Sequence, residues 1–226
     1  FSTLPKTLAQ TLAELRARRR HRDLAGQIER SVRLSDYPDT FAARRRPRKL
    51  IAVLGPTNSG KTHDAFERLA TAASGIYLGP LRLLALEAFT RLNDEFGVSA
   101  SLITGEERRI VEGSRVTAST IEMLDPEREI DVAVIDEIQM LSDPDRGWAW
   151  TQAVVGAPAE HLVLVGSPDV WDVLKGLLEH LGLPYDVVRC ERLQPLKVEQ
   201  QPAMVADARA GDAFVVFSRK DVFFYQ

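Results

Sequence analysis

The sequence predicts an α/β fold in which a doubly wound parallel sheet is flanked by helices. Short apolar runs alternate along the chain with segments of helical periodicity, as in successive βαβ units. A glycine-rich loop directly follows one of these runs and opens a helix, and two adjacent acidic residues end another run. Parallel sheets bind ligands at the carboxyl ends of their strands, so both features lie where a binding site is expected.

The expected elements follow one another in order. The apolar runs predict strands at residues 50–54, 75–78, 100–103, 115–118, 131–135 and 161–165. Apolar residues at helical spacing predict helices at residues 65–73, 83–96 and 170–181. Gly75 is expected to end the first helix, because glycine is common just past a helix end. In the second helix, Leu83, Leu84 and Leu86 are expected to pack in the core.

The glycine-rich loop has the complete pattern of a phosphate-binding loop. It consists of Gly55, Pro56, Thr57, Asn58, Ser59, Gly60, Lys61 and Thr62. Its glycines let backbone N–H groups turn toward phosphates, while Lys61 supplies a positive charge and Thr62 a ligand for Mg²⁺. The alternative is a turn with an exposed lysine, and the strand and helix on either side argue against it. The loop therefore predicts binding of a nucleoside triphosphate.

The two acids that end the run at residues 131–135 are Asp136 and Glu137. At the carboxyl edge of the sheet, Asp136 is expected to hold Mg²⁺, and Glu137 to orient the water that attacks the γ-phosphate. Adjacent acids after a strand also occur in solvated loops. The phosphate-binding loop favours the functional interpretation over that alternative.

Composition is that of a globular enzyme without a membrane span. The chain has 226 residues, which suits one or two domains, and 45% of them are hydrophobic. No stretch approaches the roughly 20 apolar residues of a membrane helix. Cys190 is the single cysteine, so no internal disulfide framework is possible, and it is expected as a small buried side chain. The four histidines lack metal-ligand spacing, which leaves Mg²⁺ as the only metal expected.

Charge is distributed unevenly along the chain. The net charge is −3, but residues 1–50 carry +8 and the remainder therefore −11. The positive charge lies in two blocks, at residues 16–22 and 44–49. Such blocks suit phosphate backbones, and they also occur in solvated faces and linkers. An arginine-rich, acid-poor leader is also compatible with a mitochondrial presequence.

Several motifs, in their sequence and spacing, resemble those of the Suv-three-like RNA helicases of superfamily two. These helicases are known from the mitochondrial RNA degradosome and from bacteria. These motifs are GPTNSGKT at 55–62, GPLRLLALE at 79–87, TGEER at 104–108, ASTIEM at 118–123, DEIQM at 136–140, RGWAW at 146–150 and VVFSRKD at 215–221. The resemblance implies a basic helical element at residues 1–47, a RecA-like ATP-binding domain at 48–192, and the beginning of a second RecA-like domain at 193–226.

The resemblance also implies roles for individual residues. ATP and Mg²⁺ would be bound by the loop at 55–62 with Asp136. Lys61, Asp136 and Glu137 would act in hydrolysis, and Gln139 would link the nucleotide state to the grip on RNA. The residues expected to hold the sugar–phosphate backbone of one strand are Pro80, Arg82, Thr104, Gly105 and Thr120.

Two of these motifs leave alternatives open. Thr120 together with Glu122 also fits a helix cap. Trp148 and Trp150 are two residues apart and cannot share one helical face. Either one of them is exposed and stacks on a base, or both pack in the core or between domains.

The function implied is that of an ATP hydrolase acting as an RNA helicase, which couples hydrolysis to translocation on single-stranded RNA and to unwinding of duplexes. The expected partner is RNA, single-stranded or duplex, and DNA is left open as an alternative substrate. An exoribonuclease is expected as a further partner. The expected location is the cytoplasm of a bacterium or the mitochondrial matrix of a eukaryote. An arginine finger would come from the second domain, so this chain alone is expected to bind nucleotide but to hydrolyse it slowly.

Two other functions compete with this one. A thymidine-kinase-like nucleoside kinase shares the Gly-Pro phosphate loop and an Asp-Glu-x-Gln segment, but its zinc lasso needs cysteines that this chain lacks. A nucleotide-gated RNA-binding scaffold would keep the ATP site as a switch, and Glu137 argues against it. The segment Gly166–Asp169 departs from the Ser-Ala-Thr coupling motif of the wider superfamily, which leaves coupling there open. The preference for ATP over GTP and the direction of movement do not follow from the residues.

Overall fold

The computed structural model describes residues 34–198 and 205–224. The first basic block, at residues 16–22, lies outside these residues. By its internal contacts the chain divides into two units, residues 1–193 and 194–226, which are described one at a time. This division lies beside the boundary predicted at 192/193, and the predicted assignment of domains stays a prediction.

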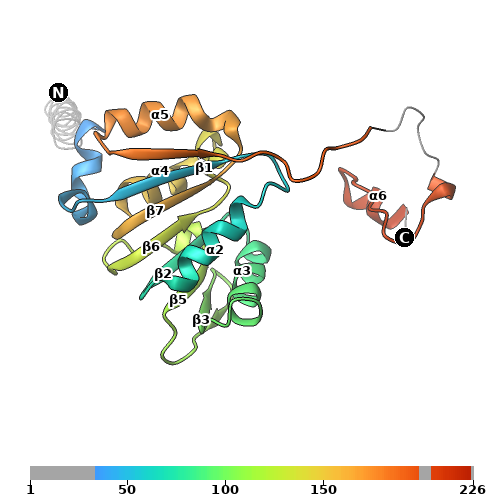
Figure 1. Ribbon diagram of the computed structural model, residues 1–226, viewed down its shortest axis with the longest axis horizontal. Helices are drawn as coiled ribbons and strands as arrows, with labels where there is room; N and C mark the ends of the chain where they lie inside the picture. The colour runs from blue at the N-terminus through green and yellow to red at the C-terminus, as the bar shows by residue number, and fades with distance from the viewer. Residues whose placement is uncertain (1–33, 199–204, 225–226) are drawn as a thin grey trace, which may run out of the picture. The chain divides into compact units, whose positions relative to one another are not determined.

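The first unit is built on one sheet of eight strands in the order β4-β3-β5-β2-β6-β7-β1-β8 (Figure 1). All neighbouring strands pair in parallel except β3 and β4, which are antiparallel. The strands are β1 Lys49–Leu54, β2 Gly75–Gly79, β3 Ala100–Ile103, β4 Arg108–Arg109, β5 Val116–Thr120, β6 Ile130–Ile135, β7 Ala159–Gly166 and β8 Tyr185–Arg189. The predicted parallel α/β fold is confirmed. The sequence did not predict β4 and β8, because β4 has two exposed arginines and β8 is a largely exposed edge strand without a clear apolar run.

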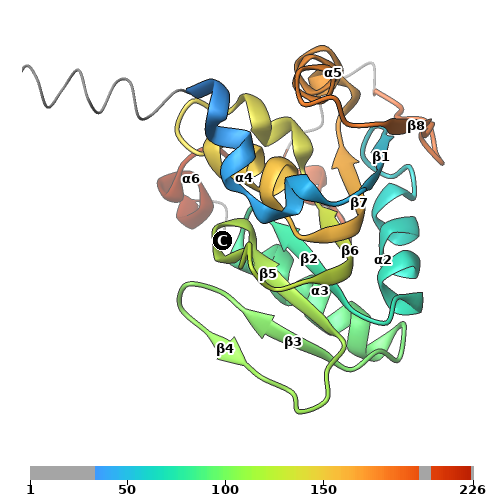
Figure 2. The ribbon, with the colours of Figure 1, turned by 90° about the vertical axis from the view of Figure 1, so that its left-hand side faces the viewer.

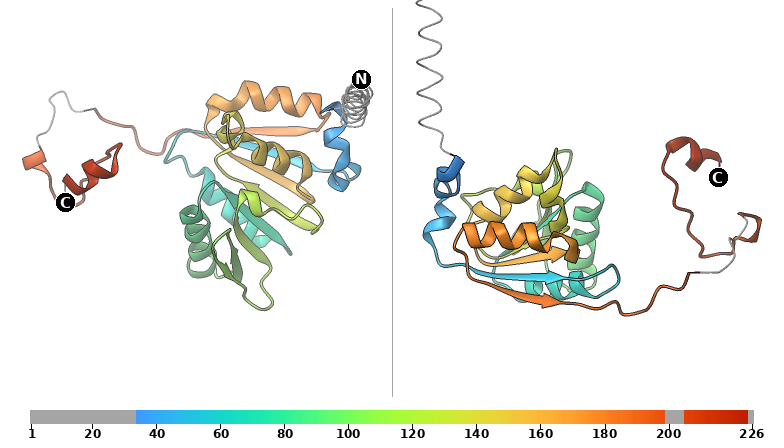
Figure 3. Two further views of the ribbon diagram at one scale, coloured as in Figure 1. Left: turned by 180° about the vertical axis from the view of Figure 1, so that it is seen from behind. Right: turned by 90° about the horizontal axis from the view of Figure 1, so that it is seen from above.

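Helices cover both faces of this sheet (Figures 2 and 3). One face carries α2 (Lys61–Thr71) and α3 (Arg82–Asp94), and the other carries α4 (Gly147–Gly156) and α5 (Trp171–His180). Short 3-10 helices fill the connections: η1 Leu34–Thr40, η2 Ala42–Arg45, η3 Ile121–Met123, η4 Ile138–Ser142 and η5 Pro168–Val170. None of the helices in the described part of the chain is both long and apolar enough to cross a membrane.

The apolar runs are nearly continuous because both faces of the sheet are buried. Along β1, Ala52 and Leu54 belong to the cluster under α4 and α5, while Val53 belongs to the cluster under α2 and α3. The central strands β6 and β7 alternate in the same way. A strand that is buried on both sides needs apolar residues at every position, which is why the sequence shows runs rather than alternation.

Two details of the helices differ from the predictions. Helix α2 ends at Thr71, and Gly75 begins strand β2 instead of closing the helix. In α3 the buried residues are Ala85, Ala88 and Leu92. The prediction of a core position is wrong for Leu83, which is 71% exposed, whereas Leu84 and Leu86 are half-buried and Leu86 packs against the core. The cause is rotation by about 100° per residue, which turns position 83 away from the face defined by Ala85 and Ala88.

One arginine of the second basic block, Arg48, serves the fold rather than a free surface. Arg48 is buried and donates hydrogen bonds to the carbonyls of Val154, Val155 and Ala157, at 3.2, 3.0 and 3.4 Å. A cation at these carbonyls suits the negative end of α4. Burial, together with the charge of Arg44, lowers the pKa of Arg48 to about 10.

Two neighbouring arginines in this block also form contacts within the chain. Arg44 donates to the carbonyl of Leu181 at 2.7 Å, and Arg46 pairs with Glu129. The interpretation of residues 44–49 as a phosphate-binding block is therefore wrong for the buried Arg48 and stays a prediction for the exposed Arg46. Their long-range partners are not visible in the local sequence.

The second unit has its own short elements, η6 (Val205–Asp207) and α6 (Arg219–Phe224). Within its described residues no strand is present, and residues 212–216 are neither helix nor strand. Val215 and Phe217 are 82% and 98% exposed. A strand needs a neighbour to pair its backbone groups, and the described part of this unit offers none.

Candidate nucleotide site and nucleic-acid groove

The predicted functional residues meet at one edge of the sheet. The carboxyl ends of β1, β7 and β6 lead into the phosphate-binding loop, Ser167 and Asp136. The carboxyl ends of β2, β5 and β3 lead into Pro80, Thr120 and Thr104. Because these six strands are consecutive in the sheet, the edge has two adjoining halves, here called the nucleotide end and the groove end.

The phosphate-binding loop takes a backbone shape that its sequence favours. Asn58 and Gly60 have positive φ angles of 58° and 81°, and Gly60 is the N-cap of α2. Glycine and asparagine are the residues that adopt this left-handed conformation most readily. The loop therefore turns straight into the N-terminus of α2, where free N–H groups and the helix dipole favour an anion.

The surroundings of the loop fit a bound phosphate. A Cβ on Gly55 would lie 2.8 Å from the carbonyl oxygen of Cys190 and 2.8 Å from Ser59 Oγ, so only glycine fits there. Ser59 Oγ is buried and has no hydrogen-bond partner in the described structure. Lys61 Nζ donates to the carbonyl of Pro56 at 2.9 Å, which keeps the ammonium group at the loop. An unpaired buried hydroxyl, a helix N-terminus and an ammonium group together suit a phosphate.

Asp136 is fixed from several sides. It is buried, and its two carboxylate oxygens accept from the Tyr77 hydroxyl at 2.7 Å and from the Glu137 N–H at 2.9 Å. The indole N–H of Trp150 donates to its carbonyl at 3.0 Å. Burial raises the pKa of Asp136, while the hydrogen bonds from Tyr77 and Glu137 and the charge of Lys61 act in the opposite direction. Burial likewise raises the pKa of Tyr77, so the tyrosine is a hydrogen-bond donor at neutral pH.

Glu137 and Gln139 connect the acidic pair to the end of β7. Glu137 has a positive φ of 51°, uncommon for a residue other than glycine, and its carboxylate accepts from the amide of Gln139. The other end of that amide accepts from the Ser167 N–H at 2.9 Å. A Cβ on Gly166 would lie 2.3 Å from Gln139 Oε1. The Gly166–Asp169 segment thus contacts the acidic pair through Gln139, although it lacks the Ser-Ala-Thr motif.

The residues expected to bind Mg²⁺ suit that ion. Thr62 lies half-buried in the first turn of α2, and Asp136 offers a carboxylate at the neighbouring strand end. Mg²⁺ in nucleotide sites is commonly held by one or two protein oxygens plus phosphate oxygens and water. This hydroxyl and carboxylate would form such a set.

The five predicted nucleic-acid residues line one open groove of about 330 Å³. They are Pro80, Arg82, Thr104, Gly105 and Thr120. The other lining residues, which were not predicted as nucleic-acid contacts, are Leu81, Glu106, Glu122, Met123 and Arg146. Glu106 lies inside the TGEER motif and Arg146 opens the RGWAW motif, so the motifs contained a signal for both.

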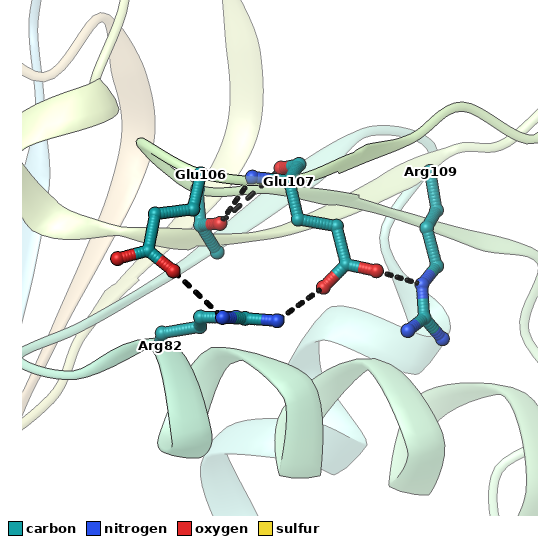
Figure 4. Close-up of polar contacts among 5 residues, drawn as sticks. Arg82, Glu106, Glu107 and Arg109 are labelled. Atoms are coloured by element: carbon teal, nitrogen blue, oxygen red, sulfur yellow. Dashed lines mark hydrogen bonds and ion pairs between the residues drawn. The ribbon is translucent and has the colours of Figure 1, made fainter.

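Arg82 is held between two acids, Glu106 and Glu107 (Figure 4). It donates to Glu106 at 2.7 Å and to Glu107 at 3.3 Å, and Glu107 also accepts from Arg109 at 2.6 Å. The buried Thr104 closes the turn, since its N–H and hydroxyl both bond the Glu107 carbonyl, at 2.8 and 3.2 Å. The hydrogen bond from Arg109 holds the pKa of Glu107 below its usual value.

Arg146 is the second arginine that lines the groove. Its guanidinium donates to Glu122 at 2.6 Å and to the carbonyl of Pro80 at 2.6 Å. Thr120 precedes η3, but its side chain makes no capping hydrogen bond. The helix-cap alternative for Thr120 is therefore wrong.

The two tryptophans separate as their spacing predicts. Trp150 is fully buried, whereas Trp148 is 58% exposed. Core packing is confirmed for Trp150, and Trp148 is the one with a ring open to solvent. Cys190 is half-buried rather than fully buried, because it follows the edge strand β8.

Comparison with known proteins gives consistent matches. The family described as the DEXQ-box helicase domain of Suv3 matches residues 36–189. The chain is 42% identical over 207 residues to the ATP-dependent RNA helicase SUV3L, mitochondrial, of Oryza sativa subsp. japonica, covering 91% of this chain and 28% of that protein. It is 44% identical over 192 residues to the ATP-dependent RNA helicase SUPV3L1, mitochondrial, of Homo sapiens, covering 83% of this chain and 24% of that protein.

Among solved structures, the DExH-box NTPase HrpB of E. coli is 19% identical with a TM-score of 0.48, over 70% of this chain and 21% of that chain. The chain spans about a quarter of the length of the two curated relatives named above. The family match confirms the resemblance found in the sequence and favours neither the nucleoside kinase nor the scaffold.

Proposed function

Because the chain belongs to the Suv3 family of DEXQ-box helicases, we propose that the whole protein is an ATP-dependent RNA helicase that moves along single-stranded RNA and unwinds duplexes. The observation that carries this proposal is the single sheet edge that holds both the phosphate-binding loop and the groove. Strand β2 joins the two halves, since Tyr77 contacts Asp136 and Pro80 begins the groove wall.

At the nucleotide end, each residue would have a separate task. The loop N–H groups, Ser59 and Lys61 would bind the phosphates. Thr62 and Asp136 would hold Mg²⁺, which neutralises phosphate charge when bound. Glu137 would orient the attacking water and accept its proton. The position of Glu137 directly after Asp136 at the nucleotide end supports this role, and the hydrogen bond from Gln139 holds its carboxylate.

At the groove end, Arg82, Thr104 and Thr120 would contact the sugar–phosphate backbone of one strand. Contacts of this kind give affinity without reading sequence. Gln139 would carry the state of the nucleotide to the Ser167 segment. The hydrogen bonds from Gln139 to Glu137 and from Ser167 to Gln139 support that path.

Partner and location follow from the relatives by analogy. RNA is the proposed substrate, because the relatives are named RNA helicases. An exoribonuclease is a proposed partner. The mitochondrial matrix is proposed if the source is a eukaryote, since the relatives are named mitochondrial, and the cytoplasm if it is a bacterium. Slow hydrolysis by this chain alone stays a prediction.

Replacing Glu137 by Gln in the whole protein tests the proposal. Hydrolysis is expected to fall on the order of 10²–10⁴-fold, because the amide cannot accept a proton. Nucleotide binding should persist, and a stable complex with ATP and RNA should accumulate, measured by co-elution of labelled ATP and RNA.

Two results would count against the helicase. A scaffold that uses ATP only as a switch would bind RNA as before, with no trapped complex. A nucleoside kinase would consume ATP only when thymidine is added. Lys61→Ala, which removes the ammonium group from the loop, provides the blank.

A further inference from the structure

The groove that is expected to bind the RNA backbone is itself lined by two carboxylates, those of Glu106 and Glu122. Two arginines line it, Arg82 and Arg146, and each is already paired with a carboxylate that lines the same groove. Glu106 pairs with Arg82 at 2.7 Å, and Glu122 pairs with Arg146 at 2.6 Å. The groove lining therefore has no excess positive charge, unlike a surface built for tight phosphate binding.

The two pairs are placed so that they can open. The side chains of Arg82 and Glu106 are 53% and 76% exposed, and those of Arg146 and Glu122 are 35% and 34% exposed. Exposed ion pairs contribute little stability, so a phosphate can replace the carboxylate at small cost. Each arginine also has a second contact that keeps it in place, Arg82 with Glu107 and Arg146 with the Pro80 carbonyl.

Glu107 differs from Glu106 in this respect. Its side chain is 22% exposed, it is bonded by Arg109, and its backbone belongs to the turn closed by Thr104. Glu107 is thus a fixed anchor for Arg82, whereas Glu106 is held by Arg82 alone among the contacts of the described structure (Figure 4).

We propose that Glu106 and Glu122 act as built-in competitors of the RNA phosphates for Arg82 and Arg146, and so set the grip on RNA low enough for release. This inference rests on the proposed RNA-binding function of the groove. On binding, each arginine exchanges its carboxylate for a phosphate. The freed carboxylate then attracts a cation from solution, which offsets the cation that leaves the strand.

The exchange has a measurable signature in salt dependence. Ordinarily the logarithm of the affinity for a single strand falls with the logarithm of salt concentration by about 0.7 per neutralised phosphate. Here the cations recruited by Glu106 and Glu122 reduce that slope. Replacing each acid by glutamine removes the competitor while keeping the shape of the side chain.

The test measures binding of a fluorescent oligouridylate to the whole protein over a KCl series. Glu106→Gln and Glu122→Gln should each raise affinity by roughly two- to fivefold, as expected for loss of an exposed ion pair. The double variant should steepen the salt slope, by up to about 0.7 per arginine. The control is Glu112→Gln, which removes the same charge from an exposed position outside the groove.

Different results would overturn the competitor role of Glu106 and Glu122 and the RNA-binding function of the groove. Unchanged or weaker binding in both glutamine variants, with Arg82→Ala and Arg146→Ala still lowering affinity, would overturn the competitor role and leave the groove as the RNA site. A gain equal to that of Glu112→Gln would also overturn it, because only overall charge would then matter. Absence of RNA binding by the unmodified protein would overturn the proposed function itself.

Discussion

The nucleotide end and the groove end of the sheet edge are built in different ways. At the nucleotide end, Asp136 is buried and each of its carboxylate oxygens is bonded inside the protein. Asn58 and Glu137 adopt left-handed backbone conformations there. At the groove end, the charged side chains are partly exposed and bonded to one another.

The two proposed tasks, hydrolysis and strand binding, need different contacts. Phosphoryl transfer depends on positioning, so its groups are fixed before the substrate arrives. A motor must also release its strand in every cycle, and exposed pairs exchange at small energetic cost.

The largest loss of stability is expected at Trp150, with Trp148, two residues away, as the comparison. Trp150→Ala should destabilise the fold by about 3–5 kcal/mol, because it empties a fully buried site and leaves the Asp136 carbonyl without its donor. Trp148→Ala should change stability by less than about 0.5 kcal/mol, since its ring is exposed. Urea denaturation measures both. If both variants lose the same free energy of unfolding, the buried ring of Trp150 contributes no more to stability than the exposed ring of Trp148.

A smaller effect is expected at Gly166. An added Cβ would lie 2.3 Å from Gln139 Oε1 and 2.9 Å from the backbone nitrogen of Ile138. Gly166→Ala should cost about 1–3 kcal/mol and displace Gln139, so RNA should stimulate hydrolysis less in the whole protein. Gly176→Ala is the matched control on α5, where an added Cβ meets nothing within 4 Å. That control should gain about 0.4–1 kcal/mol. Full RNA stimulation in Gly166→Ala would show that Gln139 does not couple the two ends.

The smallest effect is expected from Tyr77→Phe, which removes one hydroxyl and keeps the ring in the core. Loss of the bond to Asp136 should raise the Mg²⁺ concentration needed for nucleotide binding roughly tenfold, or about 1.4 kcal/mol. That bond lowers the pKa of Asp136, so its loss should raise the pKa further. Because only the ionised carboxylate binds Mg²⁺ well, Mg²⁺-dependent binding should then fail at a higher pH in the variant as the solution is acidified.

A fluorescent ATP analogue titrated with Mg²⁺ measures the effect of Tyr77→Phe. Tyr185→Phe, on the edge strand β8, is the control. If Tyr77→Phe and Tyr185→Phe show the same Mg²⁺ requirement, Tyr77 has no part in positioning Asp136.

The nucleotide end could be predicted from the sequence because its shape is encoded locally. Gly60 and Asn58 favour the left-handed turns that they adopt, and Asp136 directly follows a buried strand. The five groove residues could be placed only through the family resemblance. Their gathering in one groove follows from the order of β2, β5 and β3, which no local pattern specifies.

Residues whose partners are far away in the chain could not be predicted. Arg146 bonds Pro80 across 66 positions, and Arg48 bonds Val154 across 106. In the sequence, Arg48 is one more cation in a basic block, and only the fold places the end of α4 beside it. Tyr77 was missed for the same reason, since its hydroxyl reaches Asp136 from a neighbouring strand.

The most direct test of the central claim is phosphate release from ATP by the whole protein, with and without single-stranded RNA, using Lys61→Ala as the blank. RNA should strongly stimulate phosphate release by the unmodified protein, and Lys61→Ala should release none. Release that is indifferent to RNA would contradict the central claim, because the nucleotide end and the groove end would then not be parts of one motor.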